Sequence, residues 1–238
     1  MADLSALRVQ VFADGADRAG IAVLARDPLI RGFTTNPTLM RAAGVSDYEA
    51  FAHDVLGLVG DRPISFEAFA DDFPEMIRQA RRISSWGPQV YVKIPVTNTR
   101  GEPSSSVLRT LSSEGVRLNV TAMTTPEQVE RVMGCLEPGA PHFVSVFAGR
   151  IADTGRDPLP LMRRCVEMLS PRPELRLMWA SPREILNVIQ ADAVGCHVIT
   201  VTHDLLRKLP LLGKDLDEFS LETVQMFYRD GLGAGYRL

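Results

Sequence analysis

Cysteine is scarce in this sequence. Three cysteines, Cys135, Cys165 and Cys196, occur among 238 residues, an odd number at wide spacings with no Cys-x-x-Cys pair. Such a distribution argues against a disulfide framework and against a zinc site. We therefore expect free, buried thiols in a protein that works in a reducing compartment.

Long hydrophobic runs and an excess of positive charge are also absent. No stretch approaches the roughly 18 apolar residues that a membrane-spanning helix needs, and the first residues include early acids and no cleavable apolar segment. The net charge of −3 offers no electrostatic basis for binding nucleic acid or an anionic membrane. We expect a cytoplasmic protein that binds neither nucleic acid nor a membrane.

The composition that remains is that of an ordinary globular enzyme, with 45% hydrophobic and 23% charged residues. A chain of 238 residues is long enough for two small domains or for one α/β barrel, and it has ample apolar material for one large core. No low-complexity stretch or linker divides it. We expect a single domain over residues 1–238.

Short apolar runs alternate with longer amphipathic runs along the chain, which predicts strands alternating with helices. The predicted strands are Val9–Ala13, Gly32–Thr34, Ile64–Ala68, Val90–Pro95, Arg117–Thr121, Phe143–Phe147, Leu175–Ala180 and His197–Val201. The predicted helices are Asp17–Arg26, Tyr48–Val59, Pro74–Ser84, Ser104–Ser113, Pro126–Cys135, Pro158–Leu169, Pro182–Ala191 and Leu205–Lys208. Three of these helices begin at a proline behind a residue suited to cap them, namely Thr125, Asp157 and Ser181.

Strands that alternate with helices imply a parallel sheet. Eight such units in a chain of this length fit a closed barrel better than an open sheet. We therefore predict the α/β class, as an eightfold parallel β/α (TIM) barrel. A segment left over at about 216–229 predicts an extra C-terminal helix, which either caps the barrel or docks on a neighbouring subunit.

In such barrels, catalytic groups lie at the C-terminal ends of the strands. Seven of the predicted strands end in or lead to candidate groups, while the eighth ends without an obvious chemical group. Burying so many polar groups without partners would cost about 1–3 kcal/mol each, so we expect a functional site at this rim. The candidates are Asp14, Thr34, Thr35, Asn36, Glu67, Lys93, Asn119, Thr121, Ser145, Phe147, Arg150, Ser181 and Arg183.

Lys93 is the strongest candidate for chemistry. It lies in the apolar run Val90–Pro95, where desolvation disfavours the charged ammonium and favours the nucleophilic amine. The alternative is a structural lysine that forms a buried salt bridge with Glu67 or Asp14. The setting of the lysine favours catalysis over that alternative.

Arg150 and Arg183 follow neighbouring strands at the place where barrels of this type bind phosphate. A single loop arginine is usually solvated, but a pair beside a candidate catalytic lysine favours phosphate binding. Other candidates have ordinary structural alternatives. Thr35 or Asn36 can be only a helix cap, and Asp14 can cap the helix that follows it.

Five segments, in order, resemble the transaldolase family. They are GFTTNPTLM (32–40), YVKIPVT (91–97) around the lysine, LNVTAMTTPEQ (118–128), FVSVFAGRIADTG (143–155) and WASPRE (179–184). The resemblance runs from Val9 to about Leu209, and the modest length is similar to the small transaldolase and fructose-6-phosphate aldolase branch. It implies a Schiff-base enzyme that transfers a three-carbon dihydroxyacetone unit between sugar phosphates and uses no metal or cofactor.

The resemblance also implies a role for each matching residue. Lys93 would form the Schiff base with the ketose carbonyl. Asp14 would accept and return the proton of the hydroxyl beside the broken carbon–carbon bond. Glu67 with Thr121 would hold the water that shuttles protons while the imine forms and hydrolyses.

The remaining matching residues would bind substrate. The resemblance assigns the hydroxyls of the three-carbon unit to one group of side chains and the phosphate to another. The hydroxyls would be bound by Asn36, Asn119 and Ser145, and the phosphate by Arg150, Ser181 and Arg183. Thr34 and Phe147 complete the predicted substrate-binding set.

Two positions distinguish a transferase from a lyase. The aldolase branch resembles this chain but has Gln in place of Glu67 and Tyr in place of Phe147, which favours transfer over release of free dihydroxyacetone. The chain departs from the family pattern at Trp179, Pro182, Ala152 and Met123. These departures point to an unusual acceptor sugar and to a specialised pathway rather than the pentose phosphate pathway.

Two alternatives stand beside a transaldolase. One is a fructose-6-phosphate-type aldolase. The other is a non-catalytic barrel that binds sugar phosphates, against which Lys93, Asp14 and Glu67 argue because all three are retained. Small members of the family resemble pentamer-based rings, so the resemblance implies a homo-oligomer, a pentamer or a decamer.

Overall fold

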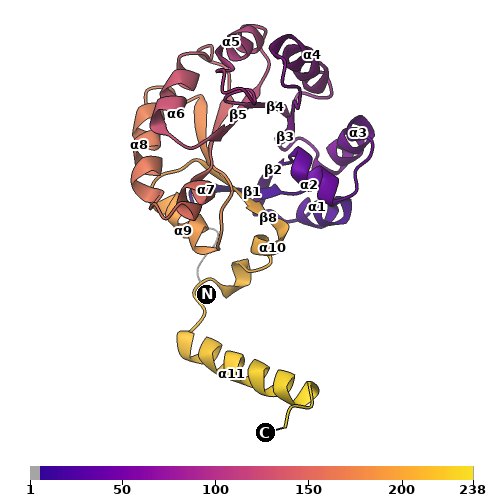
Figure 1. Ribbon diagram of the computed structural model, residues 1–238, viewed down its shortest axis with the longest axis vertical. Helices are drawn as coiled ribbons and strands as arrows, with labels where there is room; N and C mark the ends of the chain where they lie inside the picture. The colour runs from indigo at the N-terminus through magenta and orange to yellow at the C-terminus, as the bar shows by residue number, and fades with distance from the viewer. Residues whose placement is uncertain (1–5, 238) are drawn as a thin grey trace.

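Eight parallel strands close into a barrel, and helices cover its outside (Figure 1). The computed structural model describes residues 6–237. Each strand pairs with its neighbours in sequence, and β1 closes the barrel against β8, so the predicted eightfold β/α barrel is confirmed. The strands are β1 (Gln10–Asp14), β2 (Ile30–Thr34), β3 (Ile64–Glu67), β4 (Val90–Pro95), β5 (Leu118–Met123), β6 (His142–Val146), β7 (Leu175–Trp179) and β8 (Val198–Thr202).

The helices lie outside the strands and follow them in sequence. They are α1 (Arg18–Leu24), α2 (Pro37–Ala42), α3 (Tyr48–Val59), α4 (Phe73–Ser84), α5 (Ser105–Ser113), α6 (Pro126–Met133), α7 (Ala148–Asp153), α8 (Leu159–Leu169), α9 (Leu186–Ala193), α10 (His203–Leu206) and α11 (Leu216–Gly233), with a 3-10 turn, η2, at Leu209–Leu211. The sequence pattern predicts neither α2 nor α7. Each has six residues, too few for an amphipathic repeat to stand out.

Most predicted elements lie within a few residues of the observed ones, and β4 and α3 have their predicted bounds. Thr125 caps α6 as predicted. The N-cap predicted at Asp157 is wrong by one position, because α8 begins at Leu159 and its N-cap is Pro158, although the Asp157 carboxylate accepts a hydrogen bond of 2.9 Å from the Leu159 N–H. The helix predicted to begin at Pro182 behind Ser181 is wrong at its start, because α9 begins at Leu186. Ser181 has a φ of 61°, in the left-handed region, where an N-cap residue does not lie.

An apolar layer fills the interior of the barrel. It consists of Phe12, Tyr91, Phe143, Met178 and Val198, and the ring centroid of Phe143 lies 5.5 Å from that of Phe12 and 4.5 Å from that of Tyr91. Alternate residues of a strand share a face, so the residues two positions further along also point inward, one layer closer to the C-terminal rim. Four of them are polar, namely Asp14, Lys93, Ser145 and Thr200.

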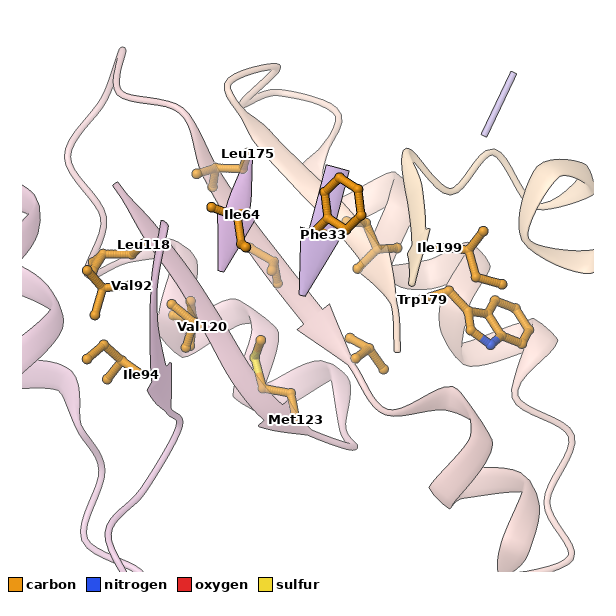
Figure 2. Packing of buried hydrophobic residues seen from close by; sticks show 14 of the residues in the cluster. Phe33, Ile64, Val92, Ile94, Leu118, Val120, Met123, Leu175, Trp179 and Ile199 are labelled. Carbon is orange, nitrogen blue, oxygen red and sulfur yellow. The ribbon is translucent and has the colours of Figure 1, made fainter. Parts of the chain in front are cut away.

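A larger core lies between the barrel and its helices (Figure 2). Val92 and Ile94, the neighbours of Lys93 on β4, are fully buried there. Both faces of each strand are therefore covered, which explains why the strands are almost continuous apolar runs. A polar residue on the inner face stands out against such a run.

The cysteines are free and buried, as predicted. Burial raises the pKa of Cys165 to about 11 and that of Cys196 to about 12. Both thiols therefore stay protonated at neutral pH, and neither has the thiolate character of a reactive cysteine.

The C-terminal helix α11 (Leu216–Gly233) is present where predicted and ends four residues beyond the predicted 229. Figure 1 shows it extending away from the barrel, and none of its residues is buried. Glu222 of this helix pairs with Lys214, just before its start, while the apolar side chains of Leu221, Val224 and Phe227 are exposed. Within residues 6–237, no helix is both long and apolar enough to cross a membrane.

Candidate active site

A cavity of about 430 Å³ opens at the carboxyl ends of the strands. All the residues given a catalytic or substrate-binding role from the sequence line it, from strands that are far apart in the chain. These residues are Asp14, Thr34, Asn36, Glu67, Lys93, Asn119, Thr121, Ser145, Phe147, Arg150, Ser181 and Arg183. Thr35, weighed as a cap, is buried beside them.

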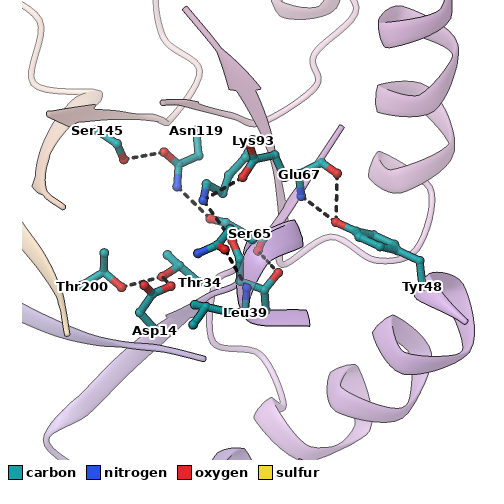
Figure 3. A network of polar contacts seen from close by, with 12 residues as sticks. Asp14, Thr34, Leu39, Tyr48, Ser65, Glu67, Lys93, Asn119, Ser145 and Thr200 are labelled. Carbon is teal, nitrogen blue, oxygen red and sulfur yellow. Dashed lines mark hydrogen bonds and ion pairs between the residues drawn. The ribbon is translucent and has the colours of Figure 1, made fainter. Parts of the chain in front are cut away.

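Lys93 and Glu67 form an ion pair in this cavity (Figure 3). They are direct partners in the register of β3 and β4, and the Lys93 Nζ atom lies 3.1 Å from Glu67 Oε2. The Lys93 ammonium also donates a hydrogen bond of 3.0 Å to the Thr35 carbonyl oxygen. The lysine side chain is only 8% exposed.

The salt bridge weighed as a structural alternative for Lys93 therefore exists. Burying two charges costs desolvation energy that roughly cancels their attraction, so such a pair contributes little to stability. The Lys93–Glu67 pair also faces a cavity rather than packed side chains. Both observations favour a chemical role for the pair over a purely structural one.

Asp14 is the last residue of β1 and lines the cavity. The Thr34 hydroxyl donates to Asp14 Oδ1 at 2.7 Å, and the Thr200 hydroxyl lies 2.5 Å from that of Thr34 (Figure 3). Since Thr34 gives its proton to the carboxylate, Thr200 is the donor to Thr34. Asp14 does not cap α1, because Asp17 does.

Burial raises the pKa of the Asp14 carboxyl. The positive charge of Lys93 and the hydrogen bond from Thr34 oppose this rise without cancelling it. A carboxyl group whose pKa is moved toward neutrality can both accept and return a proton under ordinary conditions. This direction is compatible with the proton-transfer role that the family resemblance implies for Asp14.

A second polar chain crosses β6, β5 and β3. The Ser145 hydroxyl donates to Asn119 Oδ1 at 2.6 Å, and Asn119 Nδ2 donates to the Ser65 hydroxyl at 3.0 Å (Figure 3). The Thr121 hydroxyl is buried at the cavity wall and has no hydrogen-bond partner among the described residues. These groups can hold hydroxyls of a polar substrate.

Asn36 is the N-cap of α2, where its side chain accepts a hydrogen bond of 2.9 Å from the Leu39 N–H. The capping role weighed for Asn36 is therefore real. Capping uses only the carbonyl oxygen of the amide, and its NH₂ group can still donate. A cap that lines the cavity is compatible with substrate binding.

Arg150 and Arg183 lie on the rim between α7 and the loop after β7. Arg183 donates to the Asp153 carboxylate from Nε at 2.8 Å and from Nη2 at 2.5 Å, and its Nη1 donates to the Ser181 hydroxyl at 2.9 Å. The Arg150 guanidinium lies 5.9 Å from the ring centroid of Phe147. Two guanidinium groups, one of them held in place by a carboxylate, can bind an anion such as phosphate.

Gly149 fixes the loop that carries these groups. A Cβ atom at Gly149 would lie 1.6 Å from the Ser181 carbonyl oxygen, so no side chain fits without moving the loop backbone. This close approach accompanies the left-handed φ of Ser181. Glycine at 149 thus lets the Ser181 and Arg183 side chains meet Arg150 at one rim.

The prediction that the eighth strand offers no chemical group is wrong. Thr200 and Thr202, two residues apart on β8, both line the cavity, and Thr200 is bound to Thr34. Ser65, two residues before Glu67, is likewise part of the polar layer. In each strand the two polar residues are two positions apart and so share a face, which could have indicated that they line the cavity. Threonine is also common in ordinary strands, so this spacing alone did not single out Thr200 and Thr202.

The departures from the family pattern affect the cavity less than predicted. Trp179 and Met123 are fully buried and belong to the outer core (Figure 2). Trp179 follows the inward Met178 by one position. Met123 points outward because the left-handed φ of 65° at Ala122 and a shift in the register of β5 and β6 interrupt the alternation. Ala152 is exposed outside the cavity. Only Pro182 lines the cavity, so the expected change of the acceptor pocket reduces to this residue.

Two solved structures with a similar fold have dissimilar sequences. A mandelate oxidase variant with a flavin adduct has a TM-score of 0.58 at 16% identity, with 98% of this chain and 80% of that chain covered. A protein cage designed by fusing symmetric oligomeric domains has a TM-score of 0.58 at 12% identity, over 97% of this chain and 80% of that one. At such identities the likeness shows the barrel fold alone.

Sequence comparisons are more specific. A "Probable transaldolase" of Dehalococcoides mccartyi is 34% identical over 84% of this chain and 90% of its own length. A "Probable transaldolase 2" of Listeria monocytogenes is 30% identical over 94% of this chain and 100% of its own length. The family model described as Transaldolase/Fructose-6-phosphate aldolase matches residues 11–231, from β1 into α11. The chain therefore belongs to the transaldolase/fructose-6-phosphate aldolase family.

Proposed function

We propose that the protein is a transaldolase that works through a Schiff base on Lys93. It transfers a three-carbon dihydroxyacetone unit from a ketose phosphate to an aldose or aldose phosphate acceptor. The observation that carries this proposal is the Lys93–Glu67 pair, at 3.1 Å, facing a cavity. Family membership and the names of the relatives support the same assignment.

The first step is formation of the imine. Glu67 accepts a proton from the Lys93 ammonium, and the neutral amine attacks the ketose carbonyl carbon. The carbonyl oxygen leaves as water after it receives two protons, for which Glu67 and the Thr121 hydroxyl are the adjacent groups in the cavity wall. The iminium that results draws electrons from the neighbouring carbon–carbon bond.

The second step is cleavage and transfer. Asp14 removes the proton of the hydroxyl on the carbon that will leave, that carbon departs as an aldehyde, and the bond electrons form an enamine on Lys93. The acceptor aldehyde then takes the place of the first one. The enamine carbon attacks it, Asp14 returns the proton to the new alkoxide, and hydrolysis of the imine frees Lys93.

The remaining lining residues bind rather than react. Asn36, Asn119 and Ser145 hold the hydroxyls of the three-carbon unit, with Thr34 orienting Asp14. The phosphate of the sugar lies at the rim between Arg150 and Arg183, where the Ser181 hydroxyl adds a donor. The proposed binding of hydroxyls and of phosphate thus uses two separate parts of the cavity. The hydrogen-bonded hydroxyl and amide side chains lie inside it, and the two guanidinium groups lie at its rim.

Phe147 favours transfer over release. Release of free dihydroxyacetone requires a proton on the enamine carbon before hydrolysis of the imine. Phe147 lines the cavity close to Ser145 in sequence and offers no proton donor. The alternative, a fructose-6-phosphate-type aldolase, would need a donor or an ordered water at that wall.

We also propose that α11 binds a second copy of the chain. Leu221, Val224, Phe227 and Tyr228 are exposed on this helix, which is more apolar surface than a monomer usually leaves uncovered. The barrel has a matching feature, a groove of about 460 Å³ lined by α1 and α10, where Val23 is 68% exposed. A helix of one copy in the groove of the next would cover both surfaces and give a homo-oligomer.

The barrel carries the whole site, so we propose one domain over residues 1–238 with α11 appended. Free buried cysteines support a cytoplasmic location, since a reducing compartment keeps thiols unpaired.

The Schiff base is tested by reduction with borohydride in the presence of a ketose phosphate. The chain contains three lysines, Lys93, Lys208 and Lys214, so peptide mapping is unambiguous. The three-carbon adduct should appear on Lys93 alone. It should persist when Lys208 and Lys214 are both replaced by Arg, and it should vanish in Lys93→Arg. An adduct on another lysine, or none with several ketose donors, would refute the mechanism.

The phosphate site is tested by Arg183→Ala. Loss of a charge-assisted contact of about 1.5–3 kcal/mol should raise KM for phosphorylated substrates roughly 10- to 100-fold, with a much smaller effect on unphosphorylated analogues. Arg156→Ala is the matched control, because Arg156 is exposed and does not line the cavity. Equal effects of Arg183→Ala on both substrate classes would mean that this arginine only holds the loop.

The choice between transfer and release is tested by Phe147→Tyr. A tyrosine adds a hydroxyl that can protonate the enamine or orient a water, and a general acid typically contributes ~10²–10⁴-fold. Release of dihydroxyacetone without an acceptor should therefore rise at least tenfold, while transfer falls. Phe147→Leu, the control, should lower both rates. If the unmodified enzyme already releases dihydroxyacetone as fast as it transfers it, the aldolase alternative is correct.

The role of α11 is tested by sedimentation velocity. The unmodified chain should sediment as an oligomer, and the double variant Val224→Glu, Phe227→Glu should sediment as a monomer with unchanged far-UV circular dichroism. Arg229→Ala, a polar change on the same helix, should leave the oligomer intact. A monomeric unmodified chain at micromolar concentration would contradict the proposal.

A further inference from the structure

The hydroxyl of Tyr48 is bound to the backbone of Glu67 (Figure 3). Tyr48 is the first residue of α3, and Glu67 is the last residue of β3. The Tyr48 Oη atom accepts a hydrogen bond of 2.8 Å from the Glu67 N–H and donates one of 2.9 Å to the Glu67 carbonyl oxygen. A side chain outside the barrel thus holds both backbone groups of a residue in the catalytic cavity.

The register of the sheet gives this contact its significance. In β2 and β3 the Phe33 N–H donates to the Pro63 carbonyl, and the Thr35 N–H donates to the Ser65 carbonyl at 3.1 Å. In a parallel ladder the next hydrogen bond in this series runs from the Glu67 N–H to the Thr35 carbonyl. Here the Glu67 N–H donates to Tyr48 instead.

The carbonyl that loses this ladder bond has another use. The Thr35 carbonyl oxygen accepts the hydrogen bond of 3.0 Å from Lys93 Nζ. On its other side, Glu67 stays in register with Lys93, and the Ala68 N–H donates to the Lys93 carbonyl at 3.0 Å. The Tyr48 hydroxyl therefore replaces the Thr35 carbonyl as the acceptor for the Glu67 N–H. The Lys93 ammonium replaces the Glu67 N–H as the donor to the Thr35 carbonyl.

We infer that Tyr48 is a positioning residue for the Lys93–Glu67 pair. Its hydroxyl satisfies the Glu67 backbone so that the Thr35 carbonyl remains available to hold Lys93 Nζ beside the Glu67 carboxylate. The inference rests on the proposed function for its kinetic consequence, but its geometric consequence is independent of that function. Tyr48 touches neither substrate nor reacting atoms and acts through Glu67 and Thr35.

The surroundings of Tyr48 keep its hydroxyl in this position. Its ring packs against Phe66, Phe69 and Trp86, with centroid distances of 6.4, 5.5 and 6.0 Å. Burial raises the pKa of the Tyr48 phenol, so the hydroxyl keeps the proton that it donates to the Glu67 carbonyl. A neutral phenol both donates and accepts, and both are needed here.

Removal of the hydroxyl should restore competition for the Thr35 carbonyl. A buried N–H without a partner is unfavourable, and the Thr35 carbonyl is the ladder acceptor nearest in register to the Glu67 N–H. If that bond forms, Lys93 Nζ shares or loses one of its two acceptors. The amine is then displaced from its position beside Glu67, and imine formation slows.

The test is Tyr48→Phe, which keeps the ring and removes only the hydroxyl. We expect kcat to fall roughly 10- to 100-fold, as for small misplacements of reacting groups, and the rate of borohydride trapping in a single turnover to fall with it. KM for the phosphorylated substrate should stay within about threefold, because the phosphate arginines lie on other elements. A kcat within threefold of the unmodified enzyme would overturn the inference.

Trp86→Phe is the matched control. It disturbs the same aromatic cluster but leaves the Tyr48 hydroxyl, so it should lower Tm without lowering kcat more than about threefold. Equal losses of kcat in Tyr48→Phe and Trp86→Phe would assign the effect to packing and contradict a positioning role.

A crystal structure of Tyr48→Phe separates this inference from the proposed function. We expect the Glu67 N–H to bind the Thr35 carbonyl and Lys93 Nζ to move away from it. Unchanged contacts of Lys93 with Thr35 would overturn the inference, whatever the chemistry. An unmodified enzyme that forms no imine would refute the proposed function and leave this structural outcome decisive for Tyr48.

Discussion

An ammonium group that is almost removed from water needs oxygen acceptors, and Lys93 has two, the Glu67 carboxylate and the Thr35 carbonyl. The other polar features of the barrel are arranged around this requirement. Glu67 is in register with the lysine on the neighbouring strand. Thr35 follows β2 at the point where the ladder between β2 and β3 ends, so its carbonyl is available to a side chain.

The alternation of side chains along each strand places this pair at the correct depth. An apolar layer of three aromatic rings, Met178 and Val198 fills the barrel below, and the next inward residue on several strands is polar. The layer below excludes water, which strengthens every electrostatic contact above it and raises the pKa of Asp14. The same geometry therefore supplies both a desolvated lysine and a carboxyl suited to proton transfer.

Much of this arrangement could be predicted from the sequence because it depends on local patterns. The run Val90–Pro95 has one charged residue among apolar ones, and β4 has the predicted bounds. Since the carboxyl ends of parallel strands meet at one rim, the polar residues at the strand ends could be assigned to one cavity before their distances were known. The family segments then gave each residue an expected role.

The features that could not be predicted depend on contacts between distant segments or on backbone atoms. Ser181 and Pro182 have the pattern of a helix start, but the contact of Gly149 with the Ser181 carbonyl holds that loop in another conformation. Tyr48 has the pattern of an ordinary aromatic residue at a helix start. Its contact with Glu67 arises only from the way α3 packs on β3, and the Thr35 carbonyl that it leaves available is a backbone group that every residue has.

In a Schiff-base mechanism the Lys93 amine replaces the carbonyl oxygen of the substrate. This exchange is measured directly by incubating the enzyme with a ketose phosphate in water enriched in heavy oxygen and following the mass of the recovered ketose. We expect the enzyme to speed incorporation of solvent oxygen at the carbonyl position well above the spontaneous rate, and Lys93→Met to return it to that rate. Carbon–carbon cleavage without accelerated oxygen exchange, or exchange that survives in Lys93→Met, would contradict a Schiff base on Lys93.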